Sequence, residues 1–349
     1  MSMNVTFMIG NGFDLNLGLA TKYKDFLKIY SKIQIWDSSI IQKFKKEIIK
    51  PNLELWANAE IAFGEQTTFI PNEFTVDDYC KCHSNFCEAL ANYLIGEQKR
   101  LVLNKENASI IAEKFSNAVN NLTVGFRAVQ SSAIDSLISS YGSLIFHFID
   151  FNYTDILDRI CMQTNKSFGW GLHGEYKNAM GQFSHVHGTV EQSMVLGVHD
   201  ETQISNLEAF NSYDEYYLAQ LIKSRTDAMN EENTYKQALK ILNSSDIIYI
   251  YGMSIGETDK LWWESICRLL NKKSTLRVII HSFEAPKDEL LRGAIKRFED
   301  AQKNKLFDFG NVDKEQRASI QSRVHITGAN IFEGLNNFVT QNDRQAKAS

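Results

Sequence analysis

The chain has 349 residues, of which 44% are hydrophobic and 23% are charged, and its formal net charge is −5. These values exclude a disordered or collagen-like chain, and a chain of this length buries roughly three quarters of its unfolded surface without disulfide or metal support. The acidic balance also argues against broad nucleic-acid binding, which needs a surplus of lysine and arginine on one face.

The N-terminal segment predicts a strand, a loop and a helix. Residues 5–9 form a short apolar run that leads directly into Gly10, and Thr21 is a suitable N-cap for a helix that ends at Tyr30. The apolar run is too short for a signal peptide, and the longest uncharged stretch, 136–149, is shorter than the roughly 20 residues of a spanning helix. Five cysteines form an odd set that fits reduced thiols. We therefore expect a cytoplasmic protein without a membrane partner.

The next hundred residues predict a helical insertion. Apolar residues recur at intervals of three and four from Trp36 to about Tyr141, and only three of the 19 glycines fall in this stretch. We predict that residues 36–140 are inserted into a scaffold made by residues 1–35 and 141–341. Residues 342–349 are expected to form a flexible tail.

Strand patterns return in the second half of the chain. Continuous apolar runs at 144–149, 246–251 and 276–281 are typical of parallel strands covered on both faces, and a shorter run follows at 324–327. Helical patterns lie between these strands, at 207–242, 259–270 and 287–298. The alternation predicts an α/β protein with a Rossmann-like parallel sheet and a large helical insertion.

The first candidate binding segment follows the first strand. It comprises Gly10, Asn11, Gly12, Phe13 and Asp14, with Gly18 four residues further on. Glycines after a strand let the backbone turn sharply and approach a ligand, and exposed amide groups favour phosphate. The third glycine comes six residues after the second, whereas the usual dinucleotide fingerprint has three. A tight turn with nothing bound accounts for the pattern equally well.

Two further segments follow predicted strands. Asn152 and Asp155 come after the strand at 144–149, and Gly252, Ser254 and Asp259 come after the strand at 246–251. In an open parallel sheet ligands bind outside the carboxyl ends of the strands, so these side chains are expected at the crevice. The alternative is that Asn152 closes a turn and the acids cap helices.

Histidine and cysteine residues supply the remaining candidates. His185 and His187 would share one face of a strand, and a histidine titrates near neutral pH, as a general base should. Each could equally be a hydrogen-bonded structural histidine, and a metal site would need a third ligand. Cys80, His83 and Cys87 share a helical face, but their spacing fits a core stripe better than zinc. We expect no metal.

In order, the candidate segments resemble two related families. Gly10, Gly12 and Gly18 with Leu19, then Asn152, the His187-Gly188 pair, and Gly252 with Ser254 resemble the sirtuin-like NAD-binding fold. The stretches Ile-Gly-Asn-Gly-Phe-Asp-Leu, Phe-Asn-Tyr-Thr-Asp, His-Gly and Gly-x-Ser-x-Gly-Glu-Thr-Asp are closer still to the AbiH family of phage abortive-infection proteins.

The resemblance implies defence against bacteriophage and a site that hydrolyses NAD to nicotinamide and ADP-ribose. It implies that Asn152 holds the nicotinamide ribose or the attacking water and that His187 is the general base. Gly10, Gly12 and Gly18 would approach the diphosphate, and Gly252 and Ser254 the adenosine side. Phe13 or Tyr23 would cover the nicotinamide pocket. The remaining members of the implied nucleotide site are Asn11, Asp14, Thr21, Asp155 and Asp259.

Asp14 is the residue that fits this site least well. A carboxylate beside a diphosphate is repulsive unless it turns to a ribose hydroxyl or a cation. Two alternatives therefore stay open: a nucleotide-binding sensor without catalysis, and a hydrolase of another nucleotide or nucleic acid in which His185, His187 and Asp14 hold a metal. The expected partners are NAD or a related nucleotide, a phage-derived trigger and a second copy of the chain.

Overall fold

The computed structural model describes residues 1–229, 234–286 and 292–339. The predicted tail at 342–349 and the first part of the predicted helix at 287–298 lie outside these residues. The chain divides into two compact units. Unit 1 comprises residues 1–18, 100–186 and 236–349, and unit 2 comprises residues 19–99 and 187–235.

These bounds differ from the predicted insertion at 36–140. The helices over residues 108–139 belong to the unit that contains the sheet, and a second stretch, 187–235, joins the helical unit. Helical periodicity identifies a helix but not the surface on which it packs, so it could not distinguish these two groups.

Unit 1 is built on a six-stranded sheet in which every neighbouring pair is parallel. The strand order is β5-β2-β1-β6-β7-β8, which equals 3-2-1-4-5-6 when the strands are counted along the chain. This doubly wound order places a ligand crevice where the winding reverses, between β1 and β6. The Rossmann-like class is confirmed. The strands are β1 (Ser2–Ile9), β2 (Ser143–Asp150), β5 (Ala179–His185), β6 (Ile247–Tyr251), β7 (Arg277–His281) and β8 (Val324–Thr327).

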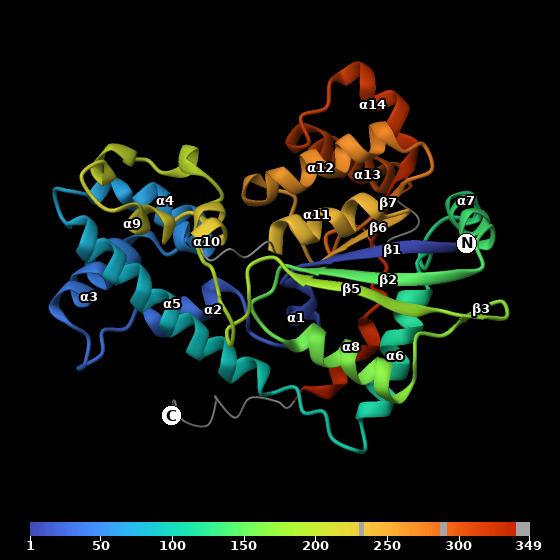
Figure 1. The fold of residues 1–349 in the computed structure, drawn as a ribbon, viewed down its shortest axis with the longest axis horizontal. Helices are drawn as coiled ribbons and strands as arrows, with labels where there is room; N and C mark the ends of the chain where they lie inside the picture. Colours follow the sequence, from blue (N-terminus) through green and yellow to red (C-terminus); the bar gives the residue numbers. More distant parts are fainter. Residues whose placement is uncertain (230–233, 287–291, 340–349) are drawn as a thin grey trace. The chain divides into compact units, whose positions relative to one another are not determined.

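Helices cover both faces of this sheet, with α6 and α8 on one face and α11, α12 and α13 on the other (Figure 1). A small hairpin of β3 (Leu172–His173) and β4 (Tyr176–Lys177) precedes β5. The helices are α1 (Gly12–Asn16), α6 (Ala108–Asn120), α7 (Ala128–Ser139), α8 (Ile156–Ser167), α11 (Thr234–Ser244), α12 (Lys260–Lys272), α13 (Arg292–Phe309) and α14 (Lys314–Ile320).

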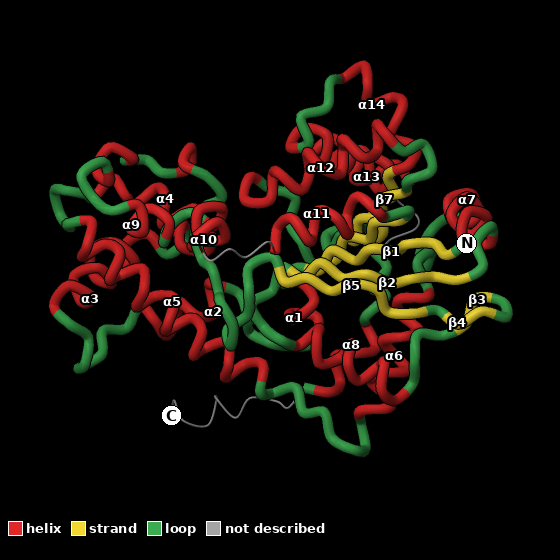
Figure 2. Tube along the Cα trace, in the orientation of Figure 1, coloured by secondary structure: helices red, strands yellow, loops and turns green. Residues whose placement is uncertain are grey.

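Unit 2 consists of helices and loops (Figure 2). The helical pattern predicted over 207–242 appears as several helical segments rather than one continuous helix, and residues 230–233 of this range lie outside the described residues. Lys22, not Thr21, is the N-cap of the first helix of the unit. The α-helices are α2 (Tyr23–Tyr30), α3 (Ser39–Phe44), α4 (Ala59–Glu65), α5 (Val76–Gln98), α9 (Glu215–Ala219) and α10 (Lys223–Met229).

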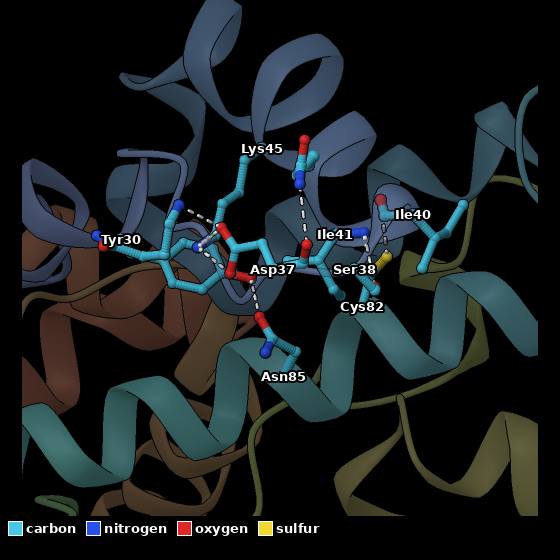
Figure 3. A network of polar contacts seen from close by, with 10 residues as sticks. Tyr30, Asp37, Ser38, Ile40, Ile41, Lys45, Cys82 and Asn85 are labelled. Atoms are coloured by element: carbon cyan, nitrogen blue, oxygen red, sulfur yellow. Dashed lines mark hydrogen bonds and ion pairs between the residues drawn. The ribbon is translucent and has the colours of Figure 1, made fainter.

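A buried ion pair fastens the loop between α2 and α3 (Figure 3). Lys45 Nζ lies 2.9 Å from Asp37 Oδ2 and 3.1 Å from Oδ1, and both side chains are only 5% exposed. The same carboxylate accepts the backbone N–H of Gln34 at 2.8 Å, and the ammonium lies 4.5 Å from the centre of the Tyr30 ring. Each charge is therefore compensated where it is buried.

Candidate functional site

The loops after β1 and β6 are locked together at the crevice. The N–H of Gly10 donates to Tyr251 O, and the N–H of Gly12 donates to Gly252 O, each at 2.9 Å. A Cβ atom on Gly12 would lie 2.4 Å from Gly252 Cα, and Gly252 itself has a φ of +71°. Close packing of two backbones thus requires glycine at these positions, whether or not a ligand approaches.

The neighbours of these glycines have different environments. Gly18 has a φ of +87° with open space around it, so its backbone conformation alone favours glycine. Asn11 is the N-cap of α1 and is half-buried. Phe13 is fully buried, and its ring contacts Phe115, Tyr251 and Phe332 at right-angle geometry. The structure therefore makes Phe13 a core residue rather than a cover for a pocket.

Asp14 is a buried acid at the start of α1. Thr154 donates its hydroxyl hydrogen to Asp14 Oδ2 at 2.7 Å, and Oδ1 is buried without a hydrogen-bond partner among the described residues. Burial raises the pKa of Asp14 to about 7, against the lowering effect of the Thr154 hydrogen bond and with a further increase from Asp155. The side chain is thus largely protonated below neutral pH, which reduces the repulsion expected beside a diphosphate.

The end of β2 supplies a second buried acid and a buried amide. Asp150 pairs in register with Ile9 of β1 and with His185 of β5, and it has no exposed surface. Its Oδ1 accepts the backbone N–H of Asn152 at 2.9 Å. Burial raises the pKa of Asp150 to about 8, although the positive charge of His185 lowers it. The Asn152 side chain is 4% exposed, and within the described chain neither its Oδ1 nor its Nδ2 has a hydrogen-bond partner.

An imidazole completes this cluster. His185 is the last residue of β5, and its Nε2 lies 2.6 Å from Asp158 Oδ2 on α8. Its Nδ1 lies 3.7 Å from Asp150 Oδ2. Burial alone would lower the pKa of His185, but the hydrogen bond to Asp158 and the charges of both acids outweigh it, so the pKa is raised. We call Asp14, Asp150, Asn152, Asp158 and His185 the strand-end cluster.

The predicted site residues divide between the two units. Unit 1 holds the predicted residues up to Gly18, together with Asn152, Asp155, Gly252, Ser254 and Asp259. Asp155 forms an ion pair of 3.7 Å with Arg159, Ser254 is exposed, and Asp259 is the N-cap of α12.

Unit 2 holds Thr21, Tyr23 and His187. Tyr23 donates to Glu60 at 3.3 Å, Glu60 pairs with Lys223 at 2.8 Å, and Lys223 Nζ lies 3.4 Å from His187 Nε2. Tyr23 and His187 are therefore linked through two residues that the sequence did not suggest. β5 ends at His185, so His185 and His187 do not share a strand face as predicted.

Three residues that share one face of α5 pack inside unit 2: Cys80, His83 and Cys87. His83 Nε2 contacts Leu196 O at 2.9 Å, and Cys87 Sγ lies 3.6 Å from the same nitrogen. Burial raises the pKa of Cys80 and Cys87 to about 12 and lowers that of His83 to about 4. Within the described residues, no group of three His, Cys, Asp or Glu side chains has the geometry of a metal site.

Sequence reasoning misses two members of the strand-end cluster and undervalues a third. Asp150 closes an apolar run, where an acid signals either a strand end or a functional carboxylate. Asp158 lies three residues after Asp155, and only the packing of α8 directs it toward β5. His185 is a candidate from the sequence, but the His-Gly pair favours His187.

A comparison with protein-family models identifies the family of this chain. The model described as "Bacteriophage abortive infection AbiH" matches residues 6–281. The chain belongs to the AbiH family. The matched range includes the second half of β1, all of β2, β5 and β6, and every residue of the strand-end cluster. No curated protein and no solved structure matched the chain. In the described part of this AbiH protein, no helix is long and apolar enough to cross a membrane.

Proposed function

We propose that this AbiH protein acts in abortive infection by hydrolysing NAD at the strand-end cluster. Membership of the family supports the defence role. The NAD-cleaving activity, the sirtuin-like character of the site and the role of NAD as the substrate are parts of the proposal.

The orphaned amide of Asn152 carries this proposal. A buried side-chain amide without partners costs on the order of 1–3 kcal/mol, so such a group is expected where a ligand supplies the missing hydrogen bonds. Asn152 stands directly after β2, on the carboxyl edge where doubly wound sheets bind nucleotides. An amide can accept from a ribose hydroxyl or from a water molecule through Oδ1 and donate through Nδ2.

The protonated acids of the site favour an anionic ligand. Asp14 and Asp150 hold protons near neutral pH because both are buried. Each is then a neutral donor rather than a negative charge, so the site accepts the diphosphate of a dinucleotide with less repulsion than its composition suggests. Asp14, which fits the implied site least well as a carboxylate, fits it as a carboxylic acid.

The reaction requires little covalent chemistry from the protein. The bond between C1′ of the nicotinamide ribose and the ring nitrogen breaks, and its electron pair leaves with nicotinamide. The oxygen of a water molecule forms the new bond to C1′ and loses one proton to a base. Asn152 would orient the ribose or that water. The resemblance gives the base to His187, which lies in unit 2.

Incubation of the purified protein with NAD tests the proposal. We expect free nicotinamide and ADP-ribose from the wild type, with or without extract of phage-infected cells as a trigger, and a loss of about 100-fold or more in Asn152→Ala. Asn178→Ala is the matched control: Asn178 is also buried, but its Oδ1 accepts the N–H of Leu144 at the opposite end of β2. Equal losses in the two variants would contradict a catalytic role for Asn152.

Calorimetry separates catalysis from sensing. Tight binding of NAD that is never cleaved, and that Asn152→Ala abolishes, would replace the hydrolase by a nucleotide sensor. Size-exclusion chromatography with and without NAD tests the expected self-association in the same samples.

A further inference from the structure

We propose that His185 is the proton acceptor of the strand-end cluster and that Asp158 positions it. This inference rests on the proposed hydrolysis of NAD and assigns its base to unit 1. It replaces the role that the family resemblance implies for His187.

Geometry fixes the tautomer of His185. Asp158 Oδ2 lies 2.6 Å from Nε2, a distance that requires a hydrogen on that nitrogen when the carboxylate is ionised. In the neutral imidazole the lone pair is then on Nδ1. An acid that holds one ring nitrogen while the other faces the reaction is the arrangement that makes a histidine an effective base.

Asp150 joins the imidazole to the amide that would hold the substrate. Its Oδ1 accepts the Asn152 backbone N–H at 2.9 Å, and its Oδ2 lies 3.7 Å from His185 Nδ1. Nδ1 is buried and, like the Asn152 side chain, makes no hydrogen bond of standard geometry in the described chain, although a contact of the imidazole with the Asn152 backbone contributes to the raised pKa of His185. A water molecule that binds the Asn152 amide and Nδ1 would satisfy both orphaned groups.

The proton transfer balances within this cluster. As the water oxygen bonds to C1′ and the electron pair of the glycosidic bond leaves with nicotinamide, the water proton passes to Nδ1. The resulting imidazolium lies between Asp158 and Asp150, and the Asp158 carboxylate that is hydrogen-bonded to Nε2 stabilises its charge. Release of that proton to solvent returns His185 to the neutral form.

The other titratable groups around His185 come from two helices. Asp14 on α1 interacts with Asp150, and Asp155, the N-cap of α8, interacts with Asp14 and pairs with Arg159. Cys161, also on α8, is fully buried, and burial raises the pKa of its thiol so that it stays neutral. Arg159 pairs with Asp155 and donates to Leu101 O at 2.7 Å, so its guanidinium is engaged by these two groups.

The pH dependence of nicotinamide release tests this assignment. In the wild type, kcat should rise with pH as the imidazolium of His185 loses its proton. Asp158→Asn removes a negative charge and should move this rise to lower pH, because the imidazolium is then less stable. His185→Gln should lower kcat by about 10²- to 10⁴-fold and abolish the rise. A purely structural role for Asp158 would change stability but not the position of the rise.

The controls separate this inference from the proposed function. His173→Gln, on β3, should leave both the rate and the profile unchanged. If the wild type cleaves NAD but His185→Gln keeps the wild-type profile while His187→Gln loses it, the base is His187 and the inference is overturned. If His185→Gln does not fold, the profile of Asp158→Asn decides alone, and an unshifted rise overturns it. A wild type that never releases nicotinamide overturns the proposed function, and this inference with it.

Discussion

Two groups of buried ionisable side chains, one in each unit, are hydrogen-bonded to different degrees. In unit 2, Asp37 and Lys45 neutralise each other, and the carboxylate also accepts a backbone N–H. In unit 1, Asp14 and Asp150 each keep one carboxyl oxygen without a hydrogen bond in the described chain, and neither side-chain polar atom of the adjacent Asn152 has one.

This difference distinguishes an ion pair that stabilises a loop from a cluster that is suited to bind a ligand. A buried pair with complete hydrogen bonding fastens a loop, and it creates no demand for a ligand. A buried cluster with missing partners costs stability, and such a cost is expected where binding or catalysis compensates for it. Burial of charge is therefore not the informative property in this protein. The informative property is whether the charge is satisfied.

The largest effect should come from breaking the satisfied pair. Lys45→Met leaves Asp37 buried and uncompensated, so the free energy of unfolding should fall by about 3–5 kcal/mol. Lys43→Met is the control: Lys43 is more exposed and pairs with Glu73 at the surface, so its loss should cost less than about 1 kcal/mol. Urea unfolding of both variants measures the difference, and equal costs would contradict the structural role of the pair.

Removing an ionisable group from the unsatisfied cluster should stabilise the protein at high pH. The pKa of Asp14 is about 7 in the folded chain against an ordinary value of 3.8, so the folded protein keeps a proton that the unfolded chain has lost. Stability from this group is complete below about pH 4 and falls as the pH rises to about 7, by on the order of 4 kcal/mol. Asp14→Asn should therefore gain in melting temperature over wild type as the pH is raised from about 5 to about 8.

Asp135→Asn is the matched control for that measurement. Asp135 is exposed and accepts a threonine hydroxyl at 3.0 Å, as Asp14 does from a buried one. Its melting temperature should follow that of the wild type at every pH. A gain for Asp14→Asn that does not depend on pH would indicate a packing effect instead.

A smaller effect is expected when both members of the satisfied pair are replaced. Lys45→Met combined with Asp37→Leu leaves no uncompensated charge, so the double variant should recover more than half of the stability lost in Lys45→Met. The N–H of Gln34 still loses its acceptor, which limits the recovery. A double-mutant cycle in urea gives the coupling, and additive losses would show that charge compensation is not what the pair provides.

The smallest change in stability should come from the orphaned amide. Asn152→Leu removes two polar atoms that have no partners in the described chain, so the free energy of unfolding should stay within about 0.5 kcal/mol of wild type or increase. Asn178→Leu removes an amide that bonds Leu144 and Asn120, and should cost about 1–3 kcal/mol. If Asn152→Leu lowers the free energy of unfolding as much as Asn178→Leu does, the two buried amides do not differ in the way that their hydrogen bonds indicate.

Most strands of the sheet can be predicted from the sequence because they are continuous apolar runs. The runs at 144–149, 246–251, 276–281 and 324–327 all appear as strands of the sheet. β5 is harder to predict, because Ala179–His185 is an edge strand of mixed polarity. The division into units is also hidden, since it depends on which helices pack together across more than a hundred residues.

The candidate site can be predicted only in part. The glycine loops and Asn152 stand out because they follow strands, where polar residues interrupt an apolar pattern. The choice of histidine cannot be made from the sequence, because it depends on where β5 ends and on which acids the neighbouring strand and helix bring to it. The sequence also does not show that Gly12 and Gly252 must be glycine to let their two backbones pack closely, because the two loops are far apart along the chain.

The chain passes back and forth between the two units, and this affects when each unit can be completed during translation. Unit 2 needs residues from 19–99 and from 187–235, and His83 on α5 reaches the carbonyl of Leu196. The first strand needs partners on both sides, and the loop after it is bonded to Tyr251 and Gly252. A growing polypeptide therefore has no finished crevice until about residue 252 has left the ribosome. Fragments released earlier lack the second wall of that crevice, although they already contain every residue of the strand-end cluster once residue 185 has been added.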